Sequence, residues 1–418
     1  MVEPGLVAPA GCQTVAMEDL LECLTRLPCG RRLLAAAAGH DGVHLVGGAV
    51  RDLLLGREPR ELDVVVEGDV APIARRLGAG ATVHERFGTA TVESGGCRFD
   101  LAAARAERYA RPGALPDVRP AGIDDDLRRR DVTVNALALD LRSGAVRAVE
   151  HARDDLAAGR LRVLHDASFG DDPTRLWRIA RYAARLGFEL EQRTAALAAA
   201  AVADGALETV SGTRIGSELR LALAEPDPVA ALEAAAGLGL APWLAPDRAL
   251  AAAALGLLAP GEGRADLVVL AASLALPACE ADGLLAGLGF NAGERAVLRA
   301  CGGARQLAVA MVDAERRPSA LARILRGLPV EAAALAGAHG AAGPARRWLE
   351  DLRHVALAIS GDDLLAAGVP RGPEIGLRLA TALDLRLDGE LAGGRDAELA
   401  AALQAPPAAA QQPGAGTS

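Results

Sequence analysis

An apolar run that stops at a pair of glycines most constrains what this chain folds into. Residues Val43 to Val46 precede Gly47-Gly48, and residues 49–55 have a helix-favouring composition, which together predict a strand, a tight turn and a helix. Two glycines let the backbone approach a ligand closely, and the start of a helix favours an anion. Arg51, one turn into the helix, can add a charge-assisted hydrogen bond to a phosphate. The stretch therefore predicts a phosphate-binding turn that includes Gly47, Gly48 and Arg51.

A second predicted strand carries two acids on one face. Glu61 and Asp63 alternate with Leu62 and Val64, and the period of two residues places both acids on the same side. Carboxylate oxygens are ligands that Mg²⁺ prefers, and this pair could hold the metal against a nucleoside triphosphate and a 3′-hydroxyl. An acidic pair on a strand is more often a solvated sheet edge. The metal site is predicted because the pair follows a phosphate-binding turn.

These two elements resemble the signature of class II tRNA nucleotidyltransferases (CCA-adding enzymes) and bacterial poly(A) polymerases, members of the polymerase-β superfamily. The family signature is GG-x-VRD-x-LLG followed by D-x-D. Here it reads Gly47 to Gly56, followed by Glu61-Leu62-Asp63. The resemblance implies a nucleotidyltransferase that holds Mg²⁺ through Glu61 and Asp63. Glu61 departs from the family, which has aspartate at this position, by one methylene.

Asp100 is a third candidate carboxylate. It lies in a predicted strand, Arg98 to Leu101, from which it could reach the metals. The alternative is a structural acid whose hydrogen bonds are satisfied within the protein. Further strands are predicted around Thr82 and from Thr89 to Val92, and the Pro- and Gly-rich segment from Tyr109 to Asp126 predicts a loop.

A second motif, Leu127 to Ala136, resembles the family's RRDFTINA sequence. Arg130 and Asp131 match its central pair, which by resemblance contacts the ribose and phosphates of the nucleotide and flanks a hinge. An arginine run on a solvated turn is the alternative. The strand-like residues 133–139 that follow argue for the first interpretation, because a buried strand fixes where the arginines point.

A third motif spans Asp171 to Phe188. Asp172 is a plausible N-cap with Pro173 at the first helical position, and at 100° per residue the arginines share one side of the helix while the apolar residues share another. The stretch resembles the family's EDP-x-R-x-L-R-x-x-R-F-A-x-R-L-G-F motif, with Asp171 in place of glutamate and Tyr182 in place of phenylalanine. A plain amphipathic helix with a solvated arginine face is the alternative.

By this resemblance, the acids and arginines of the third motif recognise the incoming base. Asp171 is included among the nucleotide-binding residues, Asp172 and Arg175 are predicted to contact the base edge, and Arg178 and Arg181 to hold the triphosphate. Cytosine and adenine both present an amino donor beside a ring-nitrogen acceptor, which one carboxylate and one arginine can satisfy. Guanine and uracil invert that pattern and would leave buried polar groups unpaired.

Charge and cysteine usage bear on partners and compartment. The chain has 418 residues, a net charge of −9 and 45 basic residues, all of them arginine, so RNA contact must come from local arginine surfaces. Six cysteines, Cys12, Cys23, Cys29, Cys97, Cys279 and Cys301, form no C-x-x-C pair and predict free thiols in a reducing cytoplasm. Residues 1–30 lack a signal-peptide pattern, and the apolar stretches are too short to cross a bilayer. A cytoplasmic protein is expected.

Together these features predict an α+β fold with a polymerase-β-like nucleotidyltransferase α/β head and a mixed sheet, followed by an all-α neck, body and tail. The expected segments are an N-terminal helical extension (1–37), the catalytic head (38–145), a helical neck with the nucleotide-recognition motif (146–215), a helical body and tail that bind tRNA (216–404) and a disordered end (405–418).

The predicted activity is template-independent addition of C and A to the tRNA 3′ end. Its expected partners are tRNA, CTP and ATP, with no obligate protein partner evident and no membrane. Three narrower activities stay open: addition of A only, of CC only, or of poly(A). A lapsed metal site in an RNA-binding protein is the alternative from another class, motivated by Glu61.

Overall fold

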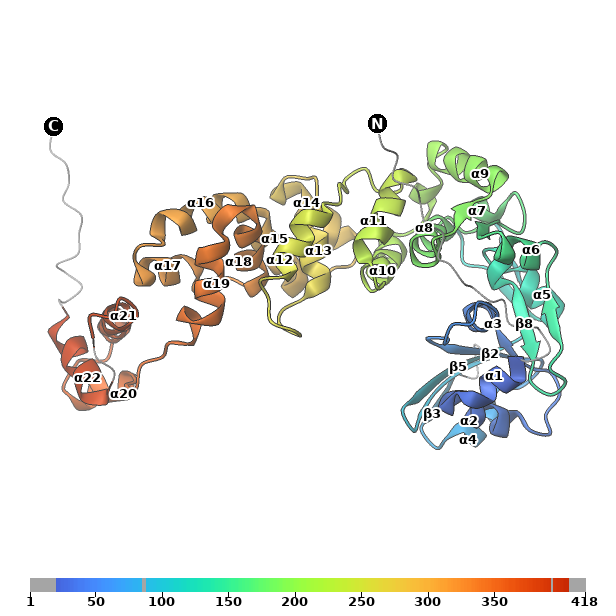
Figure 1. Cartoon of the computed structure of the whole chain (residues 1–418), viewed down its shortest axis with the longest axis horizontal. Coiled ribbons are helices and arrows are strands. Elements are labelled where there is room, and N and C mark those ends of the chain that lie inside the picture. Colours follow the sequence, from blue (N-terminus) through green and yellow to red (C-terminus); the bar gives the residue numbers. More distant parts are fainter. Residues whose placement is uncertain (1–19, 85–87, 392–393, 406–418) are drawn as a thin grey trace. The chain divides into compact units, whose positions relative to one another are not determined.

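The computed structural model describes residues 20–84, 88–391 and 394–405 (Figure 1). It divides into two compact units, Met1–Pro242 and Trp243–Ser418. The predicted disordered end lies outside the described residues from 406 onward, and the predicted boundaries at 145 and 215 stay predictions. Among the described helices, none combines the length and the apolar character needed to cross a membrane.

A seven-stranded mixed sheet forms the centre of unit 1, as the sequence predicts. In the sheet, β2 and β5 are parallel neighbours and every other neighbouring pair is antiparallel. The strands predicted at Val43 to Val46, around Thr82, from Thr89 to Val92 and from Arg98 to Leu101 are confirmed, whereas the second strand begins at Leu62, so that Glu61 lies just before it. In order across the sheet, the strands are β3 (Ala81–His84), β4 (Thr89–Ser94), β5 (Cys97–Ala103), β2 (Leu62–Val66), β1 (Val43–Val46), β8 (Leu137–Asp140) and β9 (Val146–Ala148).

The glycine pair forms the predicted turn between a strand and a helix. All four residues of β1 are buried, the chain turns at Gly47 with φ of 68°, and α3 (Gly48–Leu54) begins at the next residue. This φ lies in the left-handed region that favours glycine. A Cβ at Gly47 would also sit 2.9 Å from Nη1 of Arg130. The backbone conformation therefore disfavours any other residue at this position, and a side chain there would also have to displace the guanidinium of Arg130.

Two predictions between Tyr109 and Leu141 are wrong in part. The segment predicted as a loop contains β7 (Asp117–Pro120), which pairs with β6 (Arg105–Arg108), and the start of α5 (Ile123–Arg128). All four residues of β7 are exposed, so no apolar alternation marked it as a strand. The second prediction is that residues 133–139 are strand-like. Instead, Thr133–Asn135 form a 3₁₀ turn (η3), and β8 begins at Leu137.

The prediction that all six cysteines are free thiols is wrong for two of them. The described part of the extension forms α1 (Leu20–Arg26) and α2 (Pro28–Ala37), and a disulfide joins Cys29 of α2 to Cys97 of β5. The two cysteines are 68 residues apart in sequence and their Cα atoms lie 5.5 Å apart. Only the folded contact brings them within disulfide range. Cys23, Cys279 and Cys301 are free, and Cys12 lies outside the described residues.

Helices complete unit 1. Within α8, Leu176, Trp177 and Ile179 are buried, which confirms the predicted apolar face. The helix begins later than predicted, with Thr174 as its N-cap. These helices are α4 (Ala71–Leu77), α6 (Ala152–Ala157), α7 (Ser168–Asp171), α8 (Arg175–Leu186), α9 (Gln192–Ala203), α10 (Gly212–Leu223) and α11 (Pro228–Gly237).

The shifted start of α8 has a local cause. Asp172 is extended, with φ of −135° and ψ of 94°, as expected for a residue before proline. Its carboxylate therefore stands one turn outside the helix and accepts the backbone N–H of Thr174 at 3.1 Å.

Unit 2 is built from helices, as predicted for this part of the chain (Figure 1). They are α12 (Arg248–Leu255), α13 (Ala265–Ser273), α14 (Ala278–Gly287), α15 (Ala292–Gly302), α16 (Ala304–Ala314), α17 (Pro318–Leu325), α18 (Val330–Ala336), α19 (Ala342–Glu350), α20 (Gly361–Ala366), α21 (Pro373–Leu387) and α22 (Arg395–Gln404).

Candidate active site

Three carboxylates gather at one place on the sheet of unit 1. The register of the parallel pair β2 and β5 places Asp63 opposite Asp100, and exposed Glu61 lies just before β2. Burial, then the charge of Glu61, and more weakly that of Asp100, raise the pKa of Asp63 above its usual value, while nearby arginines oppose the shift. The acids therefore repel one another and lack full compensation by the protein.

The carboxylate pair fits a divalent cation better than the full set of three does. Glu61 and Asp63 supply the oxygen ligands that hard cations prefer, and a cation would offset the burial and the repulsion by Glu61 that raise the pKa of Asp63. Asp100 already accepts a hydrogen bond from Thr91 Oγ1 at 2.7 Å and one from Arg98 Nε at 3.2 Å. No group of three metal-ligating side chains is preformed among the residues that the structure describes.

The side chain of Arg51 donates its hydrogen bonds to residues of the protein and so supports the glycine turn. Its side chain is fully buried, and it donates to Asp52 Oδ1 from Nε at 2.9 Å and from Nη2 at 2.7 Å. Its Nη1 donates to Asn135 Oδ1 at 2.5 Å. The turn after β1 is thus tied to η3, which belongs to the second motif. Sequence reasoning missed Asn135, although it lies inside the motif that resembles RRDFTINA.

The second and third motifs meet at Asp131. Arg178 Nη2 lies 2.7 Å from Asp131 Oδ2, and the hydroxyl of Tyr182 donates to the same oxygen at 2.8 Å. Burial alone would raise the pKa of Asp131, but the charge of Arg178 and the bonds from Tyr182 and the Val132 backbone lower it to about 2. Asp131 is therefore a stable anion that holds α8 to the segment before η3.

Arg130 and Arg181 are also bonded to carboxylates. Arg130 Nη2 donates to Asp126 Oδ2 at 2.9 Å, while its buried Nε has no acceptor among the described residues. Arg181 lies between two acids, 2.8 Å from Glu218 Oε2 and 3.2 Å from Glu225 Oε1. Glu218 lies on α10 and Glu225 just after it, so Arg181 ties α8 to the end of α10.

A cavity of about 330 Å³ connects these groups. It brings together side chains from the glycine turn, the acid strand, η3 and α8. Its charged or polar lining residues are Arg51, Asp52, Arg60, Glu61, Asp63, Asn135, Arg178, Arg181, Tyr182, Arg185 and Glu225.

A neighbouring hollow of about 350 Å³ shares Asp63 and adds Asp100 and Arg130. Of the predicted site residues, Gly48, Arg51, Glu61, Asp63, Arg178 and Arg181 line the first cavity. Sequence reasoning did not select Arg60, Tyr182 or Arg185. The helical spacing that places Arg185 on the same face as Arg178 was the available signal for Arg185.

The pair predicted to contact the base lies apart from this lining. Asp172 Oδ1 accepts from Arg214 Nη2 at 2.9 Å, and buried Arg175 donates to Ser168 Oγ at 2.8 Å and to the Arg129 carbonyl at 2.8 Å. Asp171 lies 3.9 Å from His165 Nε2. Gly47 and Asp131 are likewise absent from the lining of both hollows; Gly47 lies close to the guanidinium of Arg130, and Asp131 is paired with Arg178.

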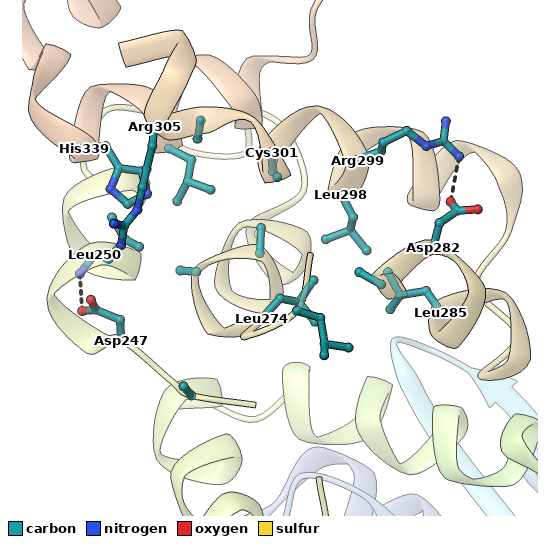
Figure 2. A pocket seen from close by; sticks show the side chains of 18 of the residues that line it. Asp247, Leu250, Leu274, Asp282, Leu285, Leu298, Arg299, Cys301, Arg305 and His339 are labelled. Atoms are coloured by element: carbon teal, nitrogen blue, oxygen red, sulfur yellow. Dashed lines mark hydrogen bonds and ion pairs between the residues drawn. The ribbon is translucent and has the colours of Figure 1, made fainter. Parts of the chain in front are cut away.

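Unit 2 contains a hollow of about 380 Å³, and comparison with it shows that size does not identify the site (Figure 2). Leu274, Leu285 and Leu298 line it, and at one end Arg299 is paired with Asp282 at 2.7 Å. Asp247 accepts the backbone N–H of Leu250 at 2.9 Å. Its two acids have partners, and hydrogen bonding to Arg299 lowers the pKa of Asp282, whereas the pKa of Asp63 is raised.

Comparisons with known proteins show the family to which this chain is related. The family profile described as "Poly A polymerase head domain" matches residues 43–162, which include β1 to β9. The chain is 36% identical over 395 residues to a protein of Geobacter sulfurreducens named A-adding tRNA nucleotidyltransferase. That alignment covers 87% of this chain and 45% of the relative, so the chain spans less than half of the relative's length.

Two further similarities cover nearly all of both proteins. The chain is 36% identical over 371 residues to the CC-adding tRNA nucleotidyltransferase of Deinococcus radiodurans, which covers 85% of this chain and 88% of that protein. The solved structure of the Thermotoga maritima CCA-adding enzyme complexed with tRNA matches with a TM-score of 0.70 at 26% identity, covering 93% of this chain and 98% of that one.

Proposed function

The chain belongs to the tRNA nucleotidyltransferase family, and we propose that it adds C and A to the 3′ end of tRNA, using CTP and ATP and releasing pyrophosphate. One observation carries the proposal. A single cavity brings together the glycine turn, the repelling acids Glu61 and Asp63, and the cationic face of α8. Phosphoryl transfer requires these three functions: a phosphate-binding turn, a cation site and counter-charges for the triphosphate.

In this proposal the acids act at the reaction centre. Glu61 and Asp63 would hold Mg²⁺, with Asp100 joining after exchange of its bond to Arg98. When bound, the metal supplies positive charge that activates the primer 3′-hydroxyl and stabilises the leaving pyrophosphate. The backbone of Gly48, which lines the cavity, would face the phosphates, and Gly47 would shape the turn that presents it. Arg51, fully buried, would keep that turn in place through Asn135.

Recognition of ribose and base is assigned to the other two motifs. Arg130 and Asp131 would lie on the ribose side, and Asp172 with Arg175 would contact the base edge, with Asp171 beside them. The hydrogen-bond pattern shared by cytosine and adenine supports this pair. Asp172 would have to exchange its present bond to Arg214, and Arg175 its bond to Ser168.

A subset of the activity is the nearest alternative. The names of the two relatives differ, one A-adding and the other CC-adding. Purified full-length protein should be incubated with Mg²⁺ and a tRNA that ends at the discriminator base, first with CTP alone, then with ATP alone, then with both. Addition of CCA supports the proposal, while addition that stops at CC, requires a CC end, or continues as poly(A) replaces it with the narrower activity.

An RNA-binding protein with a lapsed metal site is the second candidate. It is favoured by Glu61 in place of the family's aspartate and by the bonds that already occupy Asp100. Binding of tRNA without any incorporation, at every divalent cation tried, would establish this candidate and reject the enzyme.

Asp172→Ala tests the assignment of the base edge. The variant removes the carboxylate that repels the carbonyl of guanine or uracil, so addition of G and U relative to C and A should rise while total rate falls. Single-nucleotide addition with each of the four triphosphates measures this. A proportional loss on all four would mean that Asp172 only bonds Thr174 and Arg214.

A further inference from the structure

The four arginines of α8 differ in whether they have partners. Arg175, Arg178 and Arg181 each bond to a described acceptor within the protein. Arg185, one turn further along, lines the same cavity as Asp63, yet no hydrogen bond or ion pair joins it to any residue within the described ranges. Its side chain is only partly exposed. A guanidinium stays charged at all ordinary pH values. Arg185 therefore contributes a positive charge that lacks a counter-charge.

The charge of Arg181 is met by its neighbours. Glu218 and Glu225 approach its guanidinium at 2.8 and 3.2 Å, and both acids are more than four-fifths buried. Two carboxylates around one arginine cancel its attraction for a third anion. Arg60, at the edge of the cavity, lies 3.7 Å from Glu225 and is more weakly paired.

Arg185 is thus the arginine of α8 whose charge is not met by a described partner. We propose that Arg185 binds a phosphate group of the substrate in this cavity. The planar fork of a guanidinium matches two phosphate oxygens, which the tetrahedral ammonium of lysine does not. The phosphate belongs to the incoming triphosphate or to the RNA end. This inference deepens the proposed function and rests on it for the identity of the substrate.

Direct binding separates the two phosphate sources. Equilibrium dialysis of full-length protein with CTP or ATP, without RNA, measures the triphosphate, and filter binding measures tRNA. Arg185→Gln should raise the Kd of the triphosphate about tenfold or more, because a hydrogen-bonded charge is lost. The Kd of the triphosphate for Arg185→Lys should lie between the values for Arg185→Gln and wild type, since lysine keeps the charge but lacks the planar fork of the guanidinium. Weakened tRNA binding with unchanged triphosphate binding would place the phosphate on the RNA.

Arg153→Gln is the matched control. Arg153 lies on α6, is exposed, has no described partner and is absent from the lining of the cavity around Asp63. Its loss changes the net charge equally and should leave both dissociation constants within about twofold, since exposed charges interact weakly. If Arg185→Gln binds triphosphate and tRNA as tightly as wild type does, the inference is overturned.

The result that would reject the proposed function differs from the result that would overturn the role of Arg185. A wild type that binds CTP and ATP through Arg185 but adds no nucleotide to tRNA rejects the activity and keeps the binding residue. A wild type that adds nucleotides while Arg185→Gln binds normally keeps the activity and rejects the binding residue.

Discussion

The sheet side and the α8 side of the cavity compensate their charges differently. On the sheet side, Glu61 and Asp100 raise the pKa of Asp63, after the effect of burial. On the α8 side, burial opposes the shift, but the charge of Arg178 and the hydrogen bonds from Tyr182 and the Val132 backbone lower the pKa of Asp131 to about 2. Both residues are aspartates that line or support one site, so the difference comes from their neighbours. An acid that its neighbours repel is suited to bind a cation, whereas a paired acid is suited to hold a framework.

Asp63→Ala tests the sheet side and should have the largest effect. We expect incorporation to fall at least about a hundredfold, because the variant removes the proposed metal ligand from the proposed reaction centre. Affinity for tRNA should hardly change, since Asp63 does not contact backbone phosphates in the proposal. Single-turnover addition and filter binding measure the two quantities. More than a few per cent of residual activity contradicts the metal assignment.

Asp131→Asn tests the α8 side and should mainly reduce stability. Loss of the charge opposite Arg178 should cost about 2 kcal/mol in the free energy of unfolding, less than for a fully buried pair because Arg178 is partly exposed. Urea unfolding at pH 7 measures it. Asp155→Asn is the matched control, because Asp155 is buried, pairs with Arg162 at 2.8 Å and does not line the cavity. Its stability should fall by a similar amount, and its affinity for the nucleotide should stay unchanged.

The same pair predicts a pH dependence. The pKa of Asp131 in the folded protein, about 2, lies below the ordinary value of 3.8. Its stabilisation is therefore complete above pH 3.8 and is lost as the pH falls from there through 2. The difference in stability between wild type and Asp131→Asn should shrink over that window. A constant difference from pH 6 to pH 2 would show that Asp131 is not held as an anion by Arg178.

Tyr182→Phe is a smaller test of the α8 side. The variant restores the ring of the family residue but removes the hydroxyl that donates to Asp131 at 2.8 Å, at a cost of about 1 kcal/mol. The pKa of Asp131 should rise, since that hydrogen bond helps to lower it. Carboxylate NMR during an acid titration measures the shift. Tyr109→Phe, which loses a hydroxyl bonded to Glu107 at 3.0 Å, should leave Asp131 unchanged.

Glu61→Asp should have the smallest effect. It keeps the negative charge that raises the pKa of Asp63 and restores the family's residue, so activity should equal or exceed wild type within about threefold. Glu61→Gln, which removes the charge, should lower both the pKa of Asp63 and the rate. If Glu61→Asp loses activity as strongly as Glu61→Gln does, side-chain length at this position matters more than charge.

Local sequence determined the elements that form the site. The apolar run before Gly47, the period of two through Asp63 and the helical spacing in α8 each depend on residues close together in the chain, and each was predictable from them. Exposed β7 escaped prediction because it buries no face, so its residues show no alternation.

Tertiary structure decided which arginines of α8 have partners. Arg181 meets Glu218 and Glu225, which follow it by 37 and 44 residues, and Cys29 meets Cys97 across 68 residues. Periodicity shows which side of a helix faces the protein, but it does not show which residues pack opposite that side. Whether an arginine is neutralised or free depends on those distant residues, because charge pairing falls off with distance in space, whatever the separation in sequence. For this reason the sequence placed four arginines on one side of the helix without showing which of them have partners, and of these four the described structure leaves Arg185 without one.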